Sequence, residues 1–373
     1  MKKSPEMKKN KKSKKKHSQR GGESIGRKIG RFFGRLGIWL LTTLLICLAG
    51  AYVFFYYINK GPSEHLRDLF VTSVMESSAG GILASLYLSE DEIAIIQQKN
   101  TTTTFTEITD TTLVDAMAME RARTASENSA DSDFSVDNDP DGDGVELHEI
   151  SGPMYRGMMM IVYDPSRVKV ATIDNYTHSH AGKTLEDLIA DYGAIGGING
   201  GKYEDTAGMG IGGWPEGIVI SDGELRFGDR GGYYGVYGFT NDNVLVCGNM
   251  SGQAALDMGV RDAVTFGPAL IVNGVSASYS GVGSGLNPRT AIGQRADGAV
   301  LLLVIEGRKT SSMGATMGDL IEIMEEYGAV NAANLDGGMS SAMWYMGENV
   351  VSNSSIRGDR TMPTAFVVMP KED

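Results

Sequence analysis

The sequence has 373 residues, two cysteines and a formal net charge of −12 at pH 7. The charges are segregated: residues 1–35 hold fourteen Lys or Arg and two acids, which leaves 20 bases and 44 acids in the remainder. Such an acidic remainder argues against tight non-specific binding to polyanions. Cys47 lies in the apolar stretch described next, so Cys247 is the one cysteine in the part that follows this stretch and has no partner there for a disulfide.

Residues 36–59 form an uncharged, strongly apolar stretch. About 20 apolar residues suffice to cross a bilayer. A signal peptide is the alternative, but its apolar region is shorter, and the small pair Ala49–Gly50 lies inside this stretch, with more bulky residues after it. We therefore expect an uncleaved transmembrane helix. The basic residues before it predict a cytoplasmic tail over 1–35, a single span, and an extracellular carboxy-terminal part at the cell membrane. A nucleic-acid-binding tail explains Lys8–Lys16 less well beside a membrane span.

Two segments connect the span to the rest of the chain. Residues 60–100 show helical spacing of apolar side chains after a capping Ser63, which predicts a juxtamembrane helical stalk. Residues 101–144 change to Thr, Ser, Asp and Asn, which is typical of a linker. Asp137–Gly144 resembles a calcium loop, but the twelfth position is His148 rather than Glu, so the acidic linker is favoured.

Residues 145–373 are rich in glycine and in short apolar runs that predict strands. Only two segments predict helices firmly. The expected fold class is therefore α+β: a mixed β-sheet domain with few helices, preceded by one transmembrane helix.

The two predicted helices belong to matching units, 183–201 and 315–338. Each has a Thr cap with Asp three residues later, an apolar stripe, a Tyr-Gly-Ala stop, an apolar strand, and then Asn-Gly-Gly or Asp-Gly-Gly. Two unrelated tight turns are the simpler interpretation. The shared order favours an approximate internal repeat that brings Asn199 and Asp336 together.

Charged residues stand at several predicted strand ends. Arg289 follows the rigid Pro288 and precedes an apolar strand, a placement suited to bidentate recognition of phosphate or carboxylate. Glu306 and Arg308 end the next strand, and Arg360 precedes the final one. No Walker A motif is present, and Gly208, Gly210 and Gly213 are followed by Trp-Pro rather than a helix, which argues against a dinucleotide site. His178 and His180 lack an evident third metal ligand.

Three ordered motifs resemble those of the phosphodiester glycosidase family: Asn199-Gly200-Gly201, Pro288-Arg289-Thr290-Ala291, and Leu335-Asp336-Gly337-Gly338 followed by Ser340. The similarity covers about residues 150–370. Lys202 and Met339 depart from the family's aromatic and glycine, which bears on substrate shape. The family includes an enzyme that removes N-acetylglucosamine from a sugar phosphodiester, and bacterial relatives associated with exopolysaccharides.

The resemblance implies a set of roles for this sequence. Asp336 is expected to act as nucleophile or base, with Glu306 as the second carboxylate. Arg289 and Arg360 are expected to hold the phosphate. The remaining substrate-binding positions are expected at Asn199, Gly200, Gly201, Thr290, Gly337, Gly338, Ser340 and Ser341.

The predicted function is hydrolysis of a glycosyl phosphodiester in a cell-surface polysaccharide or teichoic-acid-like polymer, by an enzyme anchored in a bacterial membrane. No cofactor, metal ligand or nucleic-acid partner is predicted; a divalent ion such as calcium is an unsupported option. Two alternatives stay open: a non-catalytic polysaccharide-binding or exopolysaccharide-biosynthesis protein, and a metal-dependent phosphodiesterase.

Overall fold

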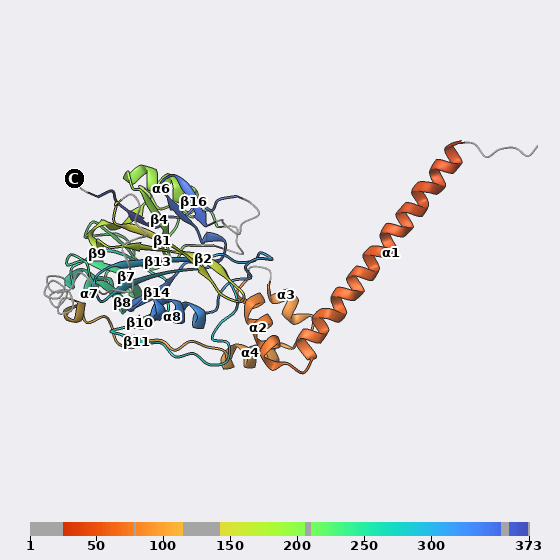
Figure 1. Ribbon diagram of the computed structural model, residues 1–373, viewed down its shortest axis with the longest axis horizontal. Coiled ribbons are helices and arrows are strands. Elements are labelled where there is room, and N and C mark those ends of the chain that lie inside the picture. Colours follow the sequence, from red (N-terminus) through yellow and green to blue (C-terminus); the bar gives the residue numbers. More distant parts are fainter. Residues whose placement is uncertain (1–24, 78–79, 115–141, 206–209, 352–357, 372–373) are drawn as a thin grey trace, which may run out of the picture. The chain divides into compact units, whose positions relative to one another are not determined.

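The computed structural model describes residues 25–77, 80–114, 142–205, 210–351 and 358–371 (Figure 1). The chain divides into two units, residues 1–57 and 58–373. The predicted basic tail lies mostly outside the described residues, as do most of the predicted linker and most of the calcium-like loop.

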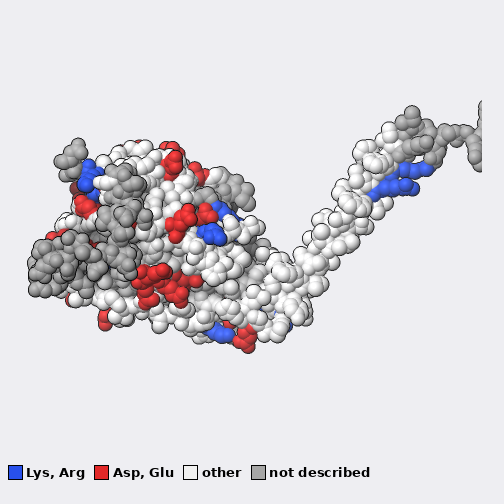
Figure 2. Space-filling model, in the orientation of Figure 1, with Lys and Arg blue, Asp and Glu red and all other residues white. Residues whose placement is uncertain are grey.

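The described residues of the first unit all belong to one long helix, α1 (Ile25–Lys60), whose last three residues fall in the second unit. Its segment Ile29–Lys60 is long and apolar enough to cross a bilayer. The most apolar window of this segment has a mean hydropathy of 2.2, and the rest of the protein does not bury it. The described Lys and Arg side chains of this unit gather near its amino-terminal end (Figure 2). The apolar helix is thus present as expected, although a signal sequence meets the same criteria, and its topology stays a prediction.

Three short helices open the second unit: α2 (Glu64–Met75), α3 (Gly80–Ser85) and α4 (Glu90–Lys99). Ser63 caps α2, as predicted, and a Ser89–Glu92 capping box opens α4. The helices enclose a small core of their own, formed by Val71, Ala84, Leu88, Ile93 and Ile96. The predicted stalk is therefore a folded helical cluster.

The first part of the predicted linker, residues 101–114, lies along the main domain. Thr103 N donates to Ser278 O at 2.8 Å, and Thr109 N donates to Cys247 O at 3.2 Å. Asn273 also accepts from Asp110 N at 2.8 Å. These bonds satisfy the backbone of an extended segment that composition alone assigns to a linker.

The main domain contains three antiparallel sheets among its described residues. The seven-stranded sheet has the order β1 (Val145–Ser151), β2 (Arg156–Val162), β13 (Val300–Ile305), β12 (Arg289–Arg295), β14 (Ala329–Leu335), β10 (Ala269–Val272), β11 (Val275–Ser276). The second has the order β16 (Glu348–Val351), β15 (Met343–Tyr345), β4 (Gly196–Asn199), β17 (Thr364–Val368), β3 (Val168–Thr172). The third has the order β6 (Glu224–Phe227), β5 (Val219–Ser221), β9 (Val260–Val264), β7 (Tyr233–Thr240), β8 (Leu245–Ser251).

The three sheets share one central hydrophobic core, and each has a helix on its other face. Met160, Phe366 and Phe239, one from each sheet, all belong to this core. Helix α8 (Met317–Glu326) covers the seven-stranded sheet, α6 (Leu185–Tyr192) the second, and α7 (Gly252–Asp257) the third (Figure 1). Short 3-10 turns at Pro165–Arg167 and Gly338–Ser340 complete the elements.

Strand β13 shows how the sequence fits this architecture. Its side chains alternate between the central core and the core under α8, and all six residues are fully buried. A continuous apolar run is what a strand covered on both faces requires. The predicted α+β fold with few helices and a preceding apolar helix is confirmed, with every described strand pair antiparallel.

The two matching units are present as helix–strand pairs. Thr184 caps α6 and Gly193 ends it in the left-handed conformation, with a φ of 63°. Thr316 and Asp319 form a complete capping box at α8. The strands that follow, β4 and β14, belong to different sheets. The units therefore meet at the junction of two sheets rather than within one.

Candidate active site

A cavity of about 300 Å³ opens at the start of β12 and the end of β14. It is lined by Glu76, Asp205, Phe266, Asn287, Pro288, Arg289, Arg308, Asn334, Leu335, Asp336, Gly337, Gly338, Met339 and Ser340. Two predicted motifs therefore meet in one polar cavity, joined by side chains from α2 and from the segment after β4.

Asp336 follows the last residue of β14 and faces this cavity. Its backbone N–H donates to Gly200 O at 3.2 Å, and its Oδ1 accepts from Gly337 N at 3.0 Å. Loss of hydration raises the pKa of Asp336 to about 7, against the lowering effect of bonds from Ser340 and Gly337. The charge of Asp205 adds to the rise. A carboxyl group with this pKa exchanges its proton near neutral pH, as acid–base and nucleophilic catalysis require.

Asp205 is a second carboxylate in the same cavity. Arg360 Nη2 lies 3.0 Å from Asp205 Oδ2 and donates to Tyr203 OH at 2.9 Å. Tyr203 OH also lies 2.9 Å from Ser340 Oγ. Arg360 thus sits behind Asp205 and is not among the lining residues. It holds Asp205 and Tyr203 in place beside Asp336.

Arg289 and Arg308 form the basic wall of the cavity. Burial lowers the pKa of Arg308, with a smaller contribution from the charge of Arg289, so the two guanidinium groups influence one another. Arg289 is 8% exposed and is held by Ala315 O and Gly285 O. Two fixed guanidinium groups on one wall suit a bound phosphate.

Glu76, just after α2, occupies part of this basic wall. Its carboxylate accepts hydrogen bonds from Arg289 Nη2 at 2.7 Å, Asn287 Nδ2 at 2.7 Å and Gly285 N at 2.8 Å. The side chain is 35% exposed. The helical cluster therefore supplies a carboxylate to the site of the main domain.

Asn199 and Thr290 lie beneath the cavity rather than along it. Asn199 Nδ2 donates to Asp336 O, and its Oδ1 accepts from Thr290 Oγ1 at 2.8 Å and Ala342 N at 3.1 Å. Both residues are buried. The structure brings Asn199 and Asp336 together as the internal repeat predicts, and the Asn199 amide joins β4 to β12 and to the segment after β14.

The glycines of the Asn-Gly-Gly turn are tightly packed. The amides of Gly200 and Gly201 donate to Thr364 O and Thr364 Oγ1, at 3.1 Å each. A Cβ atom on Gly201 would lie 2.6 Å from Val264 Cβ. These amides are engaged within the protein, whereas Gly337 and Gly338 line the cavity.

Two other predicted site residues lie outside the cavity lining. Glu306, after β13, pairs with Lys309 at 3.1 Å. Ser341 is buried, and its Oγ has no hydrogen-bond partner among the described residues. The carboxylates that do share the cavity with Asp336 are Asp205 and Glu76.

Asn334 is a lining residue that the motifs do not identify. It is 1% exposed, and its Nδ2 donates to Gly267 O at 2.9 Å. This bond fixes the orientation of the amide and leaves Oδ1 without a partner in the described part of the chain. A buried, unpaired acceptor that lines a cavity is available to a ligand donor. Its position two residues before Asp336 on the same strand is the signal that points to it.

No group of three or more His, Cys, Asp or Glu side chains able to hold a metal occurs among the described residues. His178 pairs with Glu204 at 2.6 Å, while His180 Nδ1 lies 3.0 Å from Thr177 Oγ1. The prediction that no cofactor is needed stays a prediction.

Comparisons with known proteins place this geometry in context. Residues 192–369 match the family described as phosphodiester glycosidase. The chain is 30% identical over 167 residues to the SPbeta prophage-derived uncharacterized protein YomE of Bacillus subtilis, covering 42% of the chain and 26% of that protein. It is 27% identical over 179 residues to the N-acetylglucosamine-1-phosphodiester alpha-N-acetylglucosaminidase of Mus musculus, covering 42% of the chain and 33% of the mouse protein. The chain thus spans a third or less of these curated relatives.

The solved structure of the zebrafish N-acetylglucosamine-1-phosphodiester alpha-N-acetylglucosaminidase catalytic domain, auto-inhibited by its pro-peptide, has a similar fold. The TM-score is 0.51 at 21% identity, covering 61% of this chain and 82% of that one.

Proposed function

We propose that this chain, whose residues 192–369 match the phosphodiester glycosidase family, is a membrane-anchored hydrolase that cleaves a sugar-1-phosphate diester in a cell-surface polymer. The observation that carries the proposal is the cavity itself. It sets Asp336, with a pKa of about 7, together with the Arg289–Arg308 wall. A carboxyl group for the sugar carbon and a basic wall for the phosphate are the two parts that this cleavage needs.

In this reaction the bond between the anomeric carbon and the bridging oxygen breaks, and water supplies the oxygen that stays on the sugar. The phosphate leaves with the bridging oxygen as a phosphomonoester. Asp336, once ionised, serves as nucleophile or as the base that takes a proton from water. Asp205 is the second carboxylate that we favour over Glu306, because it lines the same cavity.

Arg289 and Arg308 bind the phosphate in this proposal. The departing phosphomonoester is a weak base, so its departure needs less proton donation than that of an ordinary alkoxide, and cations stabilise the charge that develops. The acidic side chains on the visible face of the domain repel polyanions in general (Figure 2). A local basic wall is therefore the appropriate place for one phosphate of a polymer.

Other lining residues of the cavity are proposed to contact the sugar. Asn334 Oδ1 would accept a hydrogen bond from a hydroxyl or amide N–H of the sugar, since it has no partner among the described residues. Ser340, Gly337 and Gly338 also line the cavity. Arg360, Thr290 and Asn199 hold the carboxylates and the strand ends in position.

The curated names support the substrate class. The mouse relative is named as an enzyme acting on N-acetylglucosamine-1-phosphodiesters, so the first compounds to test are diesters of that sugar phosphate. The apolar helix α1 supports attachment to a membrane, with the domain outside.

Hydrolysis in oxygen-18 water tests the proposal directly. The full chain in detergent is incubated with the methyl phosphodiester of N-acetylglucosamine-1-phosphate and with a panel of other sugar-1-phosphodiesters, with and without EDTA. We expect label in the released sugar and no effect of the chelator. Label in the phosphate, or loss of activity with EDTA, would instead indicate a metal-dependent phosphodiesterase. Binding without release would indicate a polysaccharide-binding protein.

A further inference from the structure

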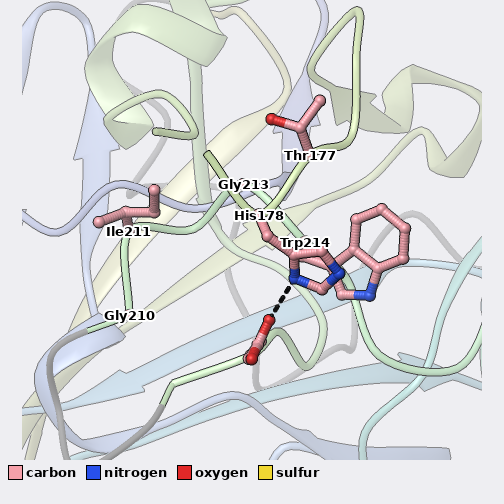
Figure 3. Close-up of a pocket in the computed structure, with 7 residues that line it drawn as sticks. Thr177, His178, Gly210, Ile211, Gly213 and Trp214 are labelled. Carbon is pink, nitrogen blue, oxygen red and sulfur yellow. Dashed lines mark hydrogen bonds and ion pairs between the residues drawn. The ribbon is translucent and has the colours of Figure 1, made fainter. Parts of the chain in front are cut away.

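The second unit contains another cavity, of about 280 Å³ (Figure 3). Its lining residues are Thr177, His178, Glu204, Gly210, Ile211, Gly213 and Trp214. None of the motifs of the phosphodiester glycosidase resemblance supplies a residue to it, and the proposed reaction does not use it.

An aromatic pair with a carboxylate forms one wall of this cavity. The His178 ring stacks on the Trp214 indole, with centroids 4.1 Å apart and an interplanar angle of 26°. Glu204 Oε2 lies 2.6 Å from His178 Nδ1 (Figure 3). Phe227 packs against the Trp214 indole edge-on, at 4.9 Å. The pair is thus fixed from two directions, while His178 and Glu204 remain 61% and 52% exposed.

The two cavities share a wall. Glu204 lines the second cavity and the next residue, Asp205, lines the candidate active site. Gly210, which also lines the second cavity, donates its N–H to Asp205 Oδ1 at 2.6 Å. Glu204 and Gly210, which line the second cavity, therefore adjoin Asp205 of the candidate active site.

The chemistry of the lining selects the ligand. Glu204 accepts hydrogen bonds, and an imidazole whose Nδ1 donates to it presents Nε2 as a further acceptor. No Arg or Lys is among the described residues that line this cavity. Such a surface suits the hydroxyl groups and C–H face of a sugar ring and disfavours a phosphate.

We infer that this second cavity is a subsite for another sugar ring of the polymer, next to the ring whose phosphodiester is cleaved. The inference rests on the proposed function for the identity of the polymer. It makes the preferred substrate an oligomer, in which one phosphate lies on the Arg289–Arg308 wall and a neighbouring sugar lies on His178 and Glu204.

Calorimetric titration of the full-length Asp336→Asn variant in detergent tests this inference without turnover. The probes are the methyl phosphodiester of N-acetylglucosamine-1-phosphate and a trimer of N-acetylglucosamine-1-phosphate units joined by phosphodiesters. We expect the trimer to bind about tenfold more tightly, the effect of one charge-assisted hydrogen bond. Adding Glu204→Gln or His178→Ala should reduce this ratio to near one.

Tyr233→Ala is the matched control, because Tyr233 is an aromatic residue that is 73% exposed and lines neither cavity. It should leave the ratio unchanged. A ratio near one in Asp336→Asn alone, or a ratio that survives both subsite variants, would overturn the inference. If the unmodified chain hydrolyses both probes but shows no preference, the proposed function stands and the subsite does not. If the preference in binding exists without hydrolysis, the subsite stands and the proposed function does not.

Discussion

The Asp336 carboxyl group is both fixed in position and poorly hydrated, a combination that a surface carboxylate lacks. Its backbone is tied to Gly200 and its Oδ1 to Gly337, so its position is fixed, while its surroundings exclude enough water to raise its pKa to about 7. Both protonation states are accessible near neutral pH for that reason. The charge of Asp205 contributes to the rise in the pKa of Asp336.

The raised pKa predicts how stability depends on pH. A folded-state pKa above the ordinary value of 3.8 means that the stabilising contribution is complete below about pH 4 and is lost as the pH rises through about 7. Asp336→Asn should therefore be more stable than the unmodified chain above pH 7, on the order of 1–2 kcal/mol after allowing for the hydrated part of the carboxyl. Chemical denaturation at pH 4, 5.5 and 7.5 measures the difference. A difference that does not grow with pH would contradict the raised pKa.

Turnover should be abolished in the Asp336→Asn variant, and a retained kcat would show that Asp336 takes no part in the chemistry.

Single substitutions can also decide whether Asp205 or Glu306 is the second carboxylate of the proposed reaction. We expect Asp205→Asn to reduce kcat about 100-fold or more, because Asp205 lines the cavity with Asp336. Glu306→Gln should reduce kcat less than about threefold, because Glu306 pairs with Lys309 outside the lining. Steady-state kinetics on the methyl phosphodiester would compare the two, with thermal unfolding as the check on folding. The reverse order of effects would restore Glu306 to the role that the motif resemblance implies.

At the scale of elements, helix α2 brings a side chain into a site otherwise built by strand ends. Ser73 Oγ accepts from Leu286 N at 2.8 Å, which places the end of the helix against the segment before β12. Glu76 follows and accepts hydrogen bonds from three donors, two of which belong to the lining residues Asn287 and Arg289. The folded helical cluster thus affects the charge of the site.

Competition between Glu76 and phosphate is testable. Glu76→Gln removes the negative charge but keeps the hydrogen-bonding shape, so inorganic phosphate should inhibit or bind several-fold more tightly, by roughly 1 kcal/mol. Glu64→Gln on the same helix, where the side chain is 72% exposed, is the control. Weaker phosphate binding in Glu76→Gln would show instead that Glu76 positions Arg289 for the substrate.

At the scale of the whole molecule, the described residues form one long apolar helix and a second unit that contains three sheets. The central core joins residues from all three sheets, so the cavity lies where sheets meet and not on a single edge. Because residues from about 76 to 340 contribute to the lining, the site requires the complete fold of the second unit.

The expected topology gives a prediction at this scale. In intact bacterial cells that express the full chain, protease added outside should degrade the domain and leave a membrane-embedded fragment that contains the amino terminus, because basic residues retain that end in the cytoplasm. A cytoplasmic protein of the host serves as the control for lysis. Protection of the domain until the cells are lysed would contradict the predicted orientation.

The sequence by itself determined the features that depend on neighbours in the chain. The apolar stretch over 36–59, the Thr184 and Thr316 caps, and the glycine stops all rest on interactions over a few residues, and the structure contains each. The motif residues Arg289 and Asp336 also reach one cavity, since the order of motifs reflects a fold shared with relatives.

Only the tertiary structure decided which other side chains join them. Asp205, Glu76 and Asn334 enter the cavity, while Glu306, which the resemblance selected, turns to Lys309, and Asn199 becomes a buried connection between strands. These outcomes depend on how three sheets close on a common core, with contacts between residues more than a hundred positions apart. Periodicity and capping carry no information on such contacts, because they record only which face of an element is buried.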